Sequence, residues 1–479
     1  MGSSRHRLNR LPPWFVAAVT VPPLAFLLLF YVWPFATLVS RGLGLGAVAD
    51  TRGRSATWRV LWVTTWQAMA STVLTLRFGL APTWAVSRVA CPGRRALLSM
   101  RTAVFVLPTV VVGAAFVALL PSSLDRSVWA ILGAHVVFNL AVVVRTVGAV
   151  WEQLPPDLEH AAATLGAGHW GVFRHVTLPL LRPALAAAAA IVFLFTFTSF
   201  GVIRVLGTAS TSTIEVEVWR RATQLGDIGG AAVLSVMQLA VLAGLVAWSA
   251  RSQRRNANEI ELQGPARRLR PTGRQRRWVA LSIGAAFAVV TVPLIALVER
   301  SLRADGSYSL AAWRSLGDDE IRPGLRLGID PLDALWNSAT TAVCATLFAV
   351  VMGGLAVLAI SALGRSGKLL DTGLMLPLGT SAVTIGFDML ITFDTPPVDW
   401  RASWWLVPVG HALVAVPFVV RATLTVSRSI DPDLGAAAAT LGAPPIRAWA
   451  STTLPFLRRP LATGAGLAAA ISLGEFGAT

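Results

Sequence analysis

Two partly polar stretches of this sequence are copies of one another, and they decide how the rest of the chain is understood. "TLGAGHWGVFRHVTLP" covers residues 164–179, and "TLGAPPIRAWASTTLP" covers residues 440–455, 276 positions later. At the same spacing, "HVVFNLAVVVR" (135–145) matches "HALVAVPFVVR" (411–421). One spacing shared by several segments is typical of a duplicated structural unit. The chain is therefore predicted to contain two copies of one unit.

The sequence around these copies has the composition of a membrane protein. Of its 479 residues, 54% are hydrophobic and 14% are charged, and the mean hydropathy is +0.63. A helix needs about 20 apolar residues to cross a hydrocarbon core about 30 Å thick, and stretches of that length recur along the chain. We predict an all-α polytopic membrane protein with spans near residues 14–36, 58–86, 99–121, 127–150, 182–205, 229–250, 277–299, 332–363, 370–393, 402–427 and 458–479.

The net charge of +17 raises the question of nucleic-acid binding. The arginines, however, gather before the first predicted span, after the second, and in residues 251–277 after the sixth. Basic residues collect in the cytoplasmic loops of membrane proteins, so this pattern predicts a cytoplasmic N-terminus and explains the charge without nucleic acid. The first apolar run is too long for the core of a signal peptide, so we expect it to remain as an anchor in the lipid bilayer.

The duplication sets the topology. Six predicted spans make up the first copy, and an even number of crossings returns the chain to its starting side, so both copies have the same orientation, as in transporters with parallel repeats. We divide the chain into a first repeat of six spans (1–256), a basic cytoplasmic linker (257–276) and a second repeat of five spans (277–479). Counterparts of residues 202–256 would lie beyond Thr479, so we expect a truncated sequence that lacks a twelfth span; an eleven-span protein is the alternative.

The copied phrases lie in loops at 153–179 and 429–455, which both face the cytoplasm in this topology. Each loop begins with an alanine-rich stretch that ends at a glycine, Gly166 or Gly442, and glycine can adopt the left-handed conformation that ends a helix. We expect a second short helix to follow and to stop at a Leu-Pro pair before the next span. Its apolar residues, spaced three apart, would share one side: Trp170 and Phe173 in the first copy, Ile446 and Trp449 in the second.

These apolar residues could pack on the protein's own loops or lie among lipid headgroups. Their occurrence in both copies favours a helix that docks on a partner protein instead. The loop also resembles a known motif, the EAA loop in the membrane subunits of ATP-binding-cassette importers. The matching positions are Ala161, Ala162, Gly166, Leu178 and Pro179 in the first copy, and Ala437, Ala438, Gly442, Leu454 and Pro455 in the second.

The tandem arrangement resembles the fused permeases of the ferric-iron and thiamine importers, over nearly the whole chain. This chain departs from the motif at its glutamate, where it has His160 and Ala436; Glu159 lies one residue earlier and could replace that glutamate in the first copy. The resemblance implies that each loop is a coupling helix that fits a groove on a separate ATPase. The residues it assigns to ATPase coupling are Glu159, Ala161, Ala162, Gly166, Trp170, Phe173, Ala437, Ala438, Gly442, Ile446 and Trp449.

The resemblance further implies a permease subunit in the cytoplasmic membrane of a bacterium, which moves its solute by alternating access. Two copies of the ATPase would bind ATP and Mg²⁺, so this chain would need no cofactor of its own. An extracytoplasmic binding protein would deliver the solute, with ferric iron or thiamine as the expected cargo. The alternative is a secondary carrier, in which duplicated bundles rock about a central site and use an ion gradient; the doubled cytoplasmic loop favours the importer.

Ionisable residues within the predicted spans are energetically expensive and therefore informative. His135 and His411 occupy equivalent positions, and we expect them to form interhelical hydrogen bonds, with metal ligation as the alternative. Asp388 lies in the second half, and Glu475 takes the place of Ser199 in a span that lines the translocation path in the family resembled. The path candidates are Ser199, Asp388 and Glu475, and pairing of the two acids with Arg77 or Arg204 is the alternative.

No stretch of the sequence indicates catalysis. "GRSGKL" (364–369) lacks both the glycine spacing and the Ser or Thr of a phosphate-binding loop. We find no nucleophile beside a base, no pair of carboxylates and no zinc-binding helix, so we predict neither a catalytic residue nor a metal site. ATP hydrolysis is therefore expected to reside on the partner subunit.

Overall fold

The structure is a computed structural model that describes residues 12–90, 94, 107–255, 270–271, 273–304, 306–317, 320–322, 325–326, 330–364, 366–394, 398–431 and 433–478. Most of these residues are helical. The regular exceptions are two short antiparallel hairpins, β1(Arg303–Ala304) with β2(Ser307–Tyr308) and β3(Glu320–Arg322) with β4(Leu325–Arg326). The prediction of an all-α polytopic fold is confirmed.

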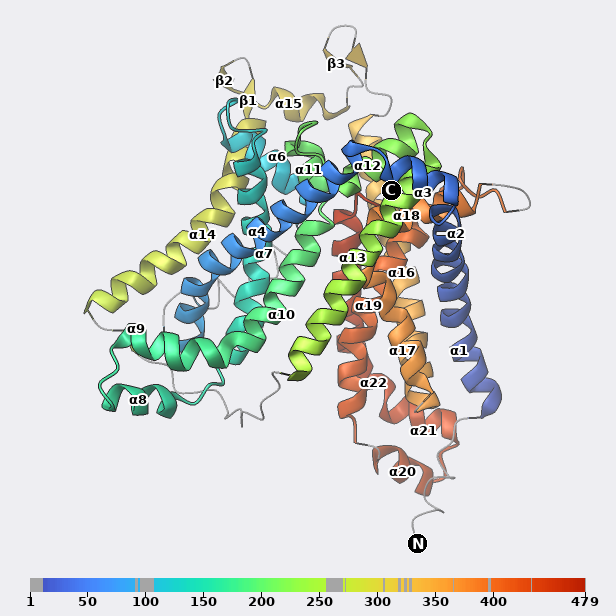
Figure 1. The fold of residues 1–479 in the computed structure, drawn as a ribbon. Helices are drawn as coiled ribbons and strands as arrows, with labels where there is room; N and C mark the ends of the chain where they lie inside the picture. The colour runs from blue at the N-terminus through green and yellow to red at the C-terminus, as the bar shows by residue number, and fades with distance from the viewer. Residues whose placement is uncertain are drawn as a thin grey trace. The chain divides into compact units, whose positions relative to one another are not determined.

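The helices form two compact units, and each is described by itself (Figure 1). Unit 1 consists of Met1–Val48, Arg221–Val233 and Ser315–Thr479. Its helices, including the first residues of α3 and α13, are α1(Pro13–Leu27), η1(Leu28–Val32), α2(Trp33–Gly42), α3(Leu45–Arg52), η3(Arg221–Leu225), α13(Ile228–Arg255), η4(Ser315–Gly317), α16(Pro331–Leu363), α17(Gly367–Met375), η5(Leu376–Gly379), α18(Ala382–Thr392), α19(Leu406–Ser429), α20(Asp433–Thr440), α21(Pro445–Thr452) and α22(Leu454–Gly474).

Unit 2 consists of Ala49–Arg220 and Leu234–Arg314. It contains the remaining residues of α3 and α13. Its other helices are α4(Ser55–Arg88), α6(Thr109–Leu119), α7(Val128–Trp151), α8(Pro156–Thr164), α9(His169–Val172), η2(Phe173–Thr177), α10(Leu178–Phe197), α11(Gly201–Leu206), α12(Ile214–Arg220), α14(Gly273–Ser301) and α15(Ala311–Arg314).

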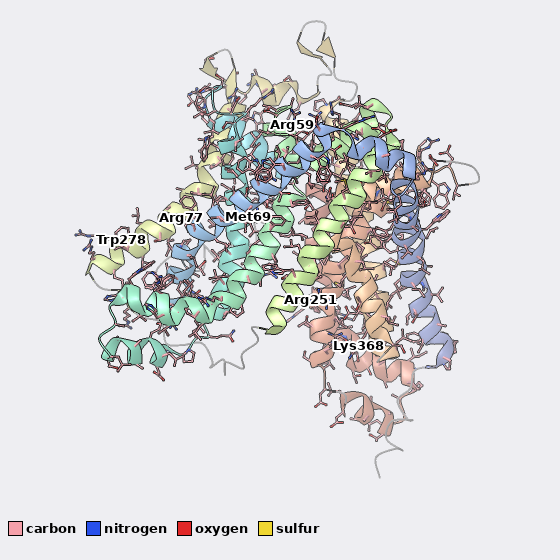
Figure 2. The ribbon with its side chains drawn as sticks, in the orientation of Figure 1. Arg59, Met69, Arg77, Arg251, Trp278 and Lys368 are labelled. Carbon is pink, nitrogen blue, oxygen red and sulfur yellow. The ribbon has the colours of Figure 1, made fainter. Side chains whose placement is uncertain are left out.

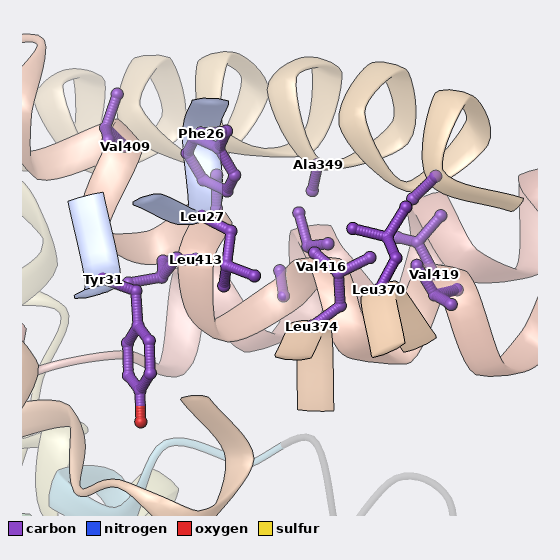
Figure 3. Packing of buried hydrophobic residues seen from close by; sticks show 14 of the residues in the cluster. Phe26, Leu27, Tyr31, Ala349, Leu370, Leu374, Val409, Leu413, Val416 and Val419 are labelled. Atoms are coloured by element: carbon purple, nitrogen blue, oxygen red, sulfur yellow. The ribbon is translucent and has the colours of Figure 1, made fainter. Parts of the chain in front are cut away.

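The first helix of the chain supplies part of the core of unit 1. Phe26 of α1 and Tyr31 of η1 are buried among apolar side chains of α16, α17 and α19 (Figure 3). The ring of Phe26 lies 5.3 Å from that of Phe348 on α16, and the hydroxyls of Tyr31 and Thr380 share a hydrogen bond of 2.7 Å. Helix α1 therefore packs with helices of the second sequence repeat.

Helix α14, which opens the second repeat, packs in unit 2. Val279 and Ile283 of α14 share a buried cluster with Ala85 and Val89 at the end of α4, and Val290 packs among residues of α6, α7 and α11. Each unit thus contains the first helix of the other sequence repeat. The proposed division at 1–256 and 277–479 describes the duplication of the sequence, whereas the packing divides the chain into units 1 and 2. Most of the proposed linker at 257–276 lies outside the described residues.

Seven of the eleven predicted spans are helices long and apolar enough to cross a membrane, among the residues that the structure describes. The predicted span at 370–393 is broken, because α17 with η5 meets α18 at an angle of 102°. Helix α6 is short, and residues 95–106 before it lie outside the described part of the chain. Helices α4 and α22 carry too many polar and charged residues to meet the same test.

Helix α4 has polar residues on its buried side and apolar residues on its exposed side. Its buried polar residues include Thr64, Gln67, Ser71, Thr72 and Thr75. Its exposed side carries mostly large apolar side chains, such as Met69, and also the arginines Arg59 and Arg77; all three are labelled in Figure 2. A helix in water has the reverse pattern, whereas lipid accepts apolar groups and leaves polar groups to be satisfied inside the protein. The exposure pattern thus explains how a fairly polar helix fits a membrane protein.

Two glycines show that the duplication extends to the packing. A Cβ atom on Gly79 of α4 would lie 2.8 Å from Cγ1 of Val143, and a Cβ on Gly353 of α16 would lie 2.7 Å from Cγ1 of Val419. Val143 and Val419 are 276 positions apart, and the two glycines are 274 apart. Equivalent helix pairs in the two units therefore touch at equivalent positions. The structure therefore aligns α4 with α16 so that equivalent residues are 274 positions apart.

We predict that Gly79→Ala destabilises unit 2. The added methyl group would overlap Val143, and overpacking of this kind costs about 1–3 kcal/mol. Thermal unfolding of the purified protein in detergent measures the loss. The matched control is Gly284→Ala on α14, where a Cβ meets nothing within 4 Å and where alanine is the better helix former. Equal melting shifts for both variants would contradict the prediction.

Candidate functional site: two equivalent loops

The first copied loop contains α8, a tight glycine turn and α9. Helix α8 begins with proline at its first position, where a missing N–H costs nothing, and ends at a turn in which Gly166 has a φ of 86°. Three backbone hydrogen bonds close this end: Leu165 N–H to Ala161 O (3.2 Å), Gly166 N–H to Ala163 O (3.0 Å) and Ala167 N–H to Ala162 O (3.1 Å). The last two bonds define a Schellman motif.

The second copied loop closes in the same way. Gly442 has a φ of 84°. The matching bonds run from Leu441 N–H to Ala437 O (3.2 Å), from Gly442 N–H to Ala439 O (3.0 Å) and from Ala443 N–H to Ala438 O (3.1 Å). The predicted left-handed glycine is therefore confirmed in both copies. Ala162 and Ala438 contribute carbonyl groups that accept the closing bonds, and neither glycine has an atom in the space that a Cβ would occupy.

The two loops differ at the Leu-Pro pair. In the second copy Thr453 separates α21 from α22, as predicted. In the first copy the expectation of a stop is wrong, because α9, η2 and α10 form one continuous helix from His169 to Phe197. The π-helical turn η2 explains the difference. Its wider hydrogen-bond spacing lies just before Pro179, which has no N–H to donate and would crowd the carbonyl four residues earlier in an α-helix.

Both loops expose leucines at equivalent positions. Leu158 and Leu434 are 45% and 42% exposed, and Leu165 and Leu441 are each 89% exposed. Each pair is 276 positions apart. Each loop therefore exposes the same two leucines. The sequence analysis did not single out these leucines, although their identity in the two copies was available as a signal.

The predicted aromatic side of the second short helix is only partly exposed. Trp170 is 70% exposed and stacks on Phe173, with ring centroids 5.5 Å apart. Phe173 is half-buried and lies 6.4 Å from the buried ring of Trp151. In the second copy Ile446 and Trp449 are half-buried, and Trp449 lies 6.3 Å from Phe15 of α1. Trp170 is thus open to a partner, whereas Phe173 and Trp449 also hold their loops to the protein.

One alanine of the motif is exposed in each copy and the other is half-buried. Ala161 and Ala437 are exposed, and Ala162 and Ala438 are half-buried. His160 and Ala436, at the glutamate position of the motif, are exposed as well. Glu159 is turned inward instead. Its Oε2 lies 2.7 Å from Nη2 of the buried Arg88, and its Oε1 accepts a hydrogen bond of 2.8 Å from the Thr177 hydroxyl.

An ion pair fixes the base of each loop, with the charges exchanged between the copies. In unit 2, Arg94 lies 3.3 Å from Glu152, which follows α7. In unit 1, Asp371 of α17 lies 3.2 Å from Arg428 near the end of α19. Glu152 and Arg428 are 276 positions apart. The position of Glu152 thus carries a base in the second copy, and the residue at this position takes part in an ion pair in both copies.

The equivalent histidines are buried and hydrogen-bonded between helices, as predicted. Nδ1 of His135 lies 3.0 Å from the Ser71 hydroxyl, and its Nε2 lies 2.9 Å from the Ser199 hydroxyl. In the second copy His411 pairs with Ser472 at 2.8 Å. Ser199, a path candidate, therefore joins α7 and the end of α10 within unit 2.

We predict that His135→Leu destabilises the protein, because two buried hydroxyls lose their partner. Each buried group left without a partner costs about 1–3 kcal/mol. Thermal unfolding in detergent measures the effect. The triple variant Ser71→Ala, His135→Leu, Ser199→Ala also removes the two hydroxyls that would be left without a partner. It should therefore be more stable than His135→Leu and recover part of the lost stability. A triple variant no more stable than His135→Leu would contradict this explanation.

The two acidic path candidates lie in unit 1 in different environments. Asp388 on α18 is 1% exposed, and neither carboxylate oxygen has a hydrogen-bond partner among the described residues. Oε1 of Glu475 accepts N–H bonds from Phe476, Gly477 and Ala478 at 3.0, 2.7 and 3.3 Å. Arg204, considered as a partner from the sequence, lies over the ring of Trp219 in unit 2 at 4.5 Å.

The comparisons with known proteins identify the family. Residues 84–258 match the family described as "binding-protein-dependent transport system inner membrane component". The sulfate transport system permease protein CysT of Escherichia coli is 32% identical over 196 residues, which are 38% of this chain and 71% of CysT. The chain belongs to this family. It is the multi-pass inner-membrane permease subunit of an ATP-driven importer, and it is not itself an enzyme.

Other relatives match most of the chain. The thiamine transport system permease protein ThiP of Salmonella typhimurium is 26% identical over 445 residues, and that of E. coli is 28% identical over 454 residues. Each alignment covers 88% of this chain and 80% of the relative. Among solved structures, a bacterial ABC transporter that imports the acidic polysaccharide alginate aligns with a TM-score of 0.43 and 18% identity, over 51% of this chain and 96% of that chain.

Proposed function

We propose that this permease imports thiamine, which an extracytoplasmic binding protein delivers and which crosses the membrane by alternating access. The observation that carries the proposal is the extent of the match. Relatives named as thiamine permeases align along both sequence halves, over 88% of the chain. The sulfate permease aligns over only 38% of it. A cargo-specific likeness should include both halves of a fused permease, so thiamine is favoured over sulfate.

The copied loops are proposed as the docking surfaces for two copies of an ATPase subunit, one for each loop. The support is their repeated geometry: the same glycine turn and the same exposed leucines in both copies. Helices with exposed apolar residues bind in grooves of partner proteins. The predicted orientation places the N-terminus and both loops in the cytoplasm, where ATP is available, because the arginine-rich segments lie on that side.

Ser199, Asp388 and Glu475 are proposed to lie along the translocation path. The support is chemical, because buried polar groups in a membrane are costly and are kept where they serve transport. Asp388 is the strongest of the three, since it is fully buried without a hydrogen-bond partner among the described residues, and such a costly group in a membrane is kept where it serves a function. Thiamine carries a permanent positive charge on its thiazolium ring, which is consistent with an acid on its path.

Uptake of radiolabelled thiamine tests the proposal. The permease is expressed with its ATPase and binding protein in E. coli cells that lack ThiP, and accumulation is expected only when all three subunits are present. Unlabelled thiamine should compete, and sulfate or ferric iron should not. Uptake should persist when a protonophore collapses the ion gradients while ATP is maintained, and it would stop if the chain were a secondary carrier. Accumulation of sulfate or iron instead of thiamine would reassign the cargo.

A further inference from the structure

A buried ion pair ties helix α8 of the first copied loop to the end of α4. Arg88, the last residue of α4, is 7% exposed, and its two terminal nitrogens have separate partners. Nη2 binds Oε2 of Glu159 at 2.7 Å, and Nη1 donates to the carbonyl of Leu154 at 2.9 Å. The other oxygen of Glu159 accepts the Thr177 hydroxyl at 2.8 Å. Both ends of the first loop, α8 and η2, are thereby attached to one guanidinium group.

These contacts occupy both carboxylate oxygens of Glu159. Each carboxylate oxygen already has a charged or hydroxyl partner within hydrogen-bond distance, and charge-assisted bonds to arginine are the stronger kind. Since Arg88 is buried, loss of its partner would leave a charge without compensation inside the protein. Glu159 therefore serves as an internal positioning residue, and the leucines and Trp170 are left to meet the ATPase.

The second copy has lost both members of this pair. In the register fixed by Gly79 and Gly353, Arg88 corresponds to Ala362 on α16. In the register of the loops, Glu159 corresponds to Gly435, and Thr177 to Thr453. A joint change of acid and base to residues without side-chain charge is expected if the two act only as a pair, because either charge alone would be costly to bury.

Nothing replaces the pair on α20 within the described part of the chain. The hydrogen bonds of its residues remain inside the loop; they join Thr440 to Ala437, and Asp433 and Leu434 to Asp431. Among the described residues, the second loop is held further along, where Trp449 of α21 meets Phe15 and Ala448 is buried. The helices α8 and α20 thus lie in loops that expose matching leucines, but the two helices are attached to the rest of the protein by different contacts.

We propose that Arg88, Glu159 and Thr177 form a latch that orders the first docking loop in advance, and that the second loop, which has no latch, binds the ATPase more weakly. The inference rests on the proposed docking role of the loops. Its physical basis is preorganisation: a loop already held in its bound shape loses less conformational freedom when its partner binds. The two ATPase copies therefore hold the permease unequally, although the surfaces that they meet are copies.

Single-loop variants of the full-length permease in lipid nanodiscs test the latch. Gly442→Val disables the second loop and leaves the latched loop, whereas Gly166→Val leaves the loop without a latch. Binding of the ATPase subunit without nucleotide is measured for each variant. The latched-loop variant is expected to bind about tenfold more tightly, a difference of the size that ordering a few side chains costs. Adding Glu159→Gln to Gly442→Val should remove this advantage, and adding it to Gly166→Val should change nothing.

A conservative substitution separates positioning from folding. Thr177→Ser keeps the hydroxyl and should preserve the tight binding of the Gly442→Val variant, whereas Thr177→Val should weaken it. Hydrogen exchange of the unaltered permease gives a second measure that needs no variant to fold: amides of α8 should exchange more slowly than those of α20. Equal exchange in both helices, or equal ATPase binding by both single-loop variants, would overturn the latch. If both single-loop variants bound the ATPase as tightly as the unaltered protein, the result would instead contradict the docking role of the loops.

Discussion

Replacement of both Gly166 and Gly442 by valine is expected to abolish ATPase binding and transport. Both glycines have φ values near 85°, a region that a β-branched residue avoids. A residue other than glycine in the left-handed region costs about 1–3 kcal/mol. The costs at two separate loops add to about 4 kcal/mol, which is roughly a thousandfold in affinity. Co-purification of the ATPase with the permease from detergent measures the effect.

The matched control for the first loop is Gly168→Ala. Gly168 lies two residues after Gly166, but its φ is −66° and a Cβ there would meet nothing within 4 Å. This variant should retain the ATPase and transport at the level of the unaltered protein. Loss of the ATPase from Gly168→Ala as well would mean that the loop tolerates no change, and the argument from the left-handed turn would fail.

The double variant Leu165→Asp, Leu441→Asp should lose ATPase binding without loss of stability. Each leucine is 89% exposed in the permease, so the folded subunit gains little from it. Burying one leucine against a partner contributes about 1.5–3 kcal/mol, and an aspartate in its place would have to lose its hydration in a groove that fits leucine. We expect at least a hundredfold weaker association, about 3 kcal/mol.

Measurements of binding and of stability must be made on the same preparations of this variant. The melting temperature should stay within the range of the unaltered protein, because substitutions at exposed sites rarely change stability by more than about 0.5 kcal/mol. The variant Leu165→Met, Leu441→Met keeps apolar side chains of similar size and should keep the ATPase. An aspartate variant that binds normally would show that the exposed leucines are not the docking surface.

Local chemistry made much of the site predictable from sequence. The glycine turns follow from a conformation that only glycine adopts without strain, so the identity and spacing of Gly166 and Gly442 were sufficient. The buried bonds of His135 and His411 followed from the cost of an unpaired polar group in a membrane. Membrane crossing followed from hydropathy, except where a helix such as α4 combines buried hydroxyls with an exposed apolar side.

Contacts between distant segments could not be predicted in this way. Glu159 was expected to meet the ATPase, because sequence showed an acid near the motif and did not show Arg88, 71 positions away, beside it. The break in the predicted span at 370–393 depends on how α18 packs, and the π turn before Pro179 depends on how α9 joins α10. The pairing of Glu159 with Arg88 is decided by a neighbour that is remote along the chain, whereas the π turn depends on the geometry by which consecutive helices join.

The sequence by itself determined the class of the protein, its duplication and the shape of its two glycine turns, since hydropathy, repeated spacing and the conformational freedom of glycine do not depend on which distant segments pack together. Only the tertiary structure decided which helices share a core, with α1 in unit 1 beside helices of the second repeat and α14 in unit 2 beside helices of the first. It also decided that Glu159 of the first loop pairs with Arg88, 71 positions away along the chain. Apolar faces of similar helices can pack in several combinations at similar free energy, so the choice among them depends on the fit of particular side chains across the core.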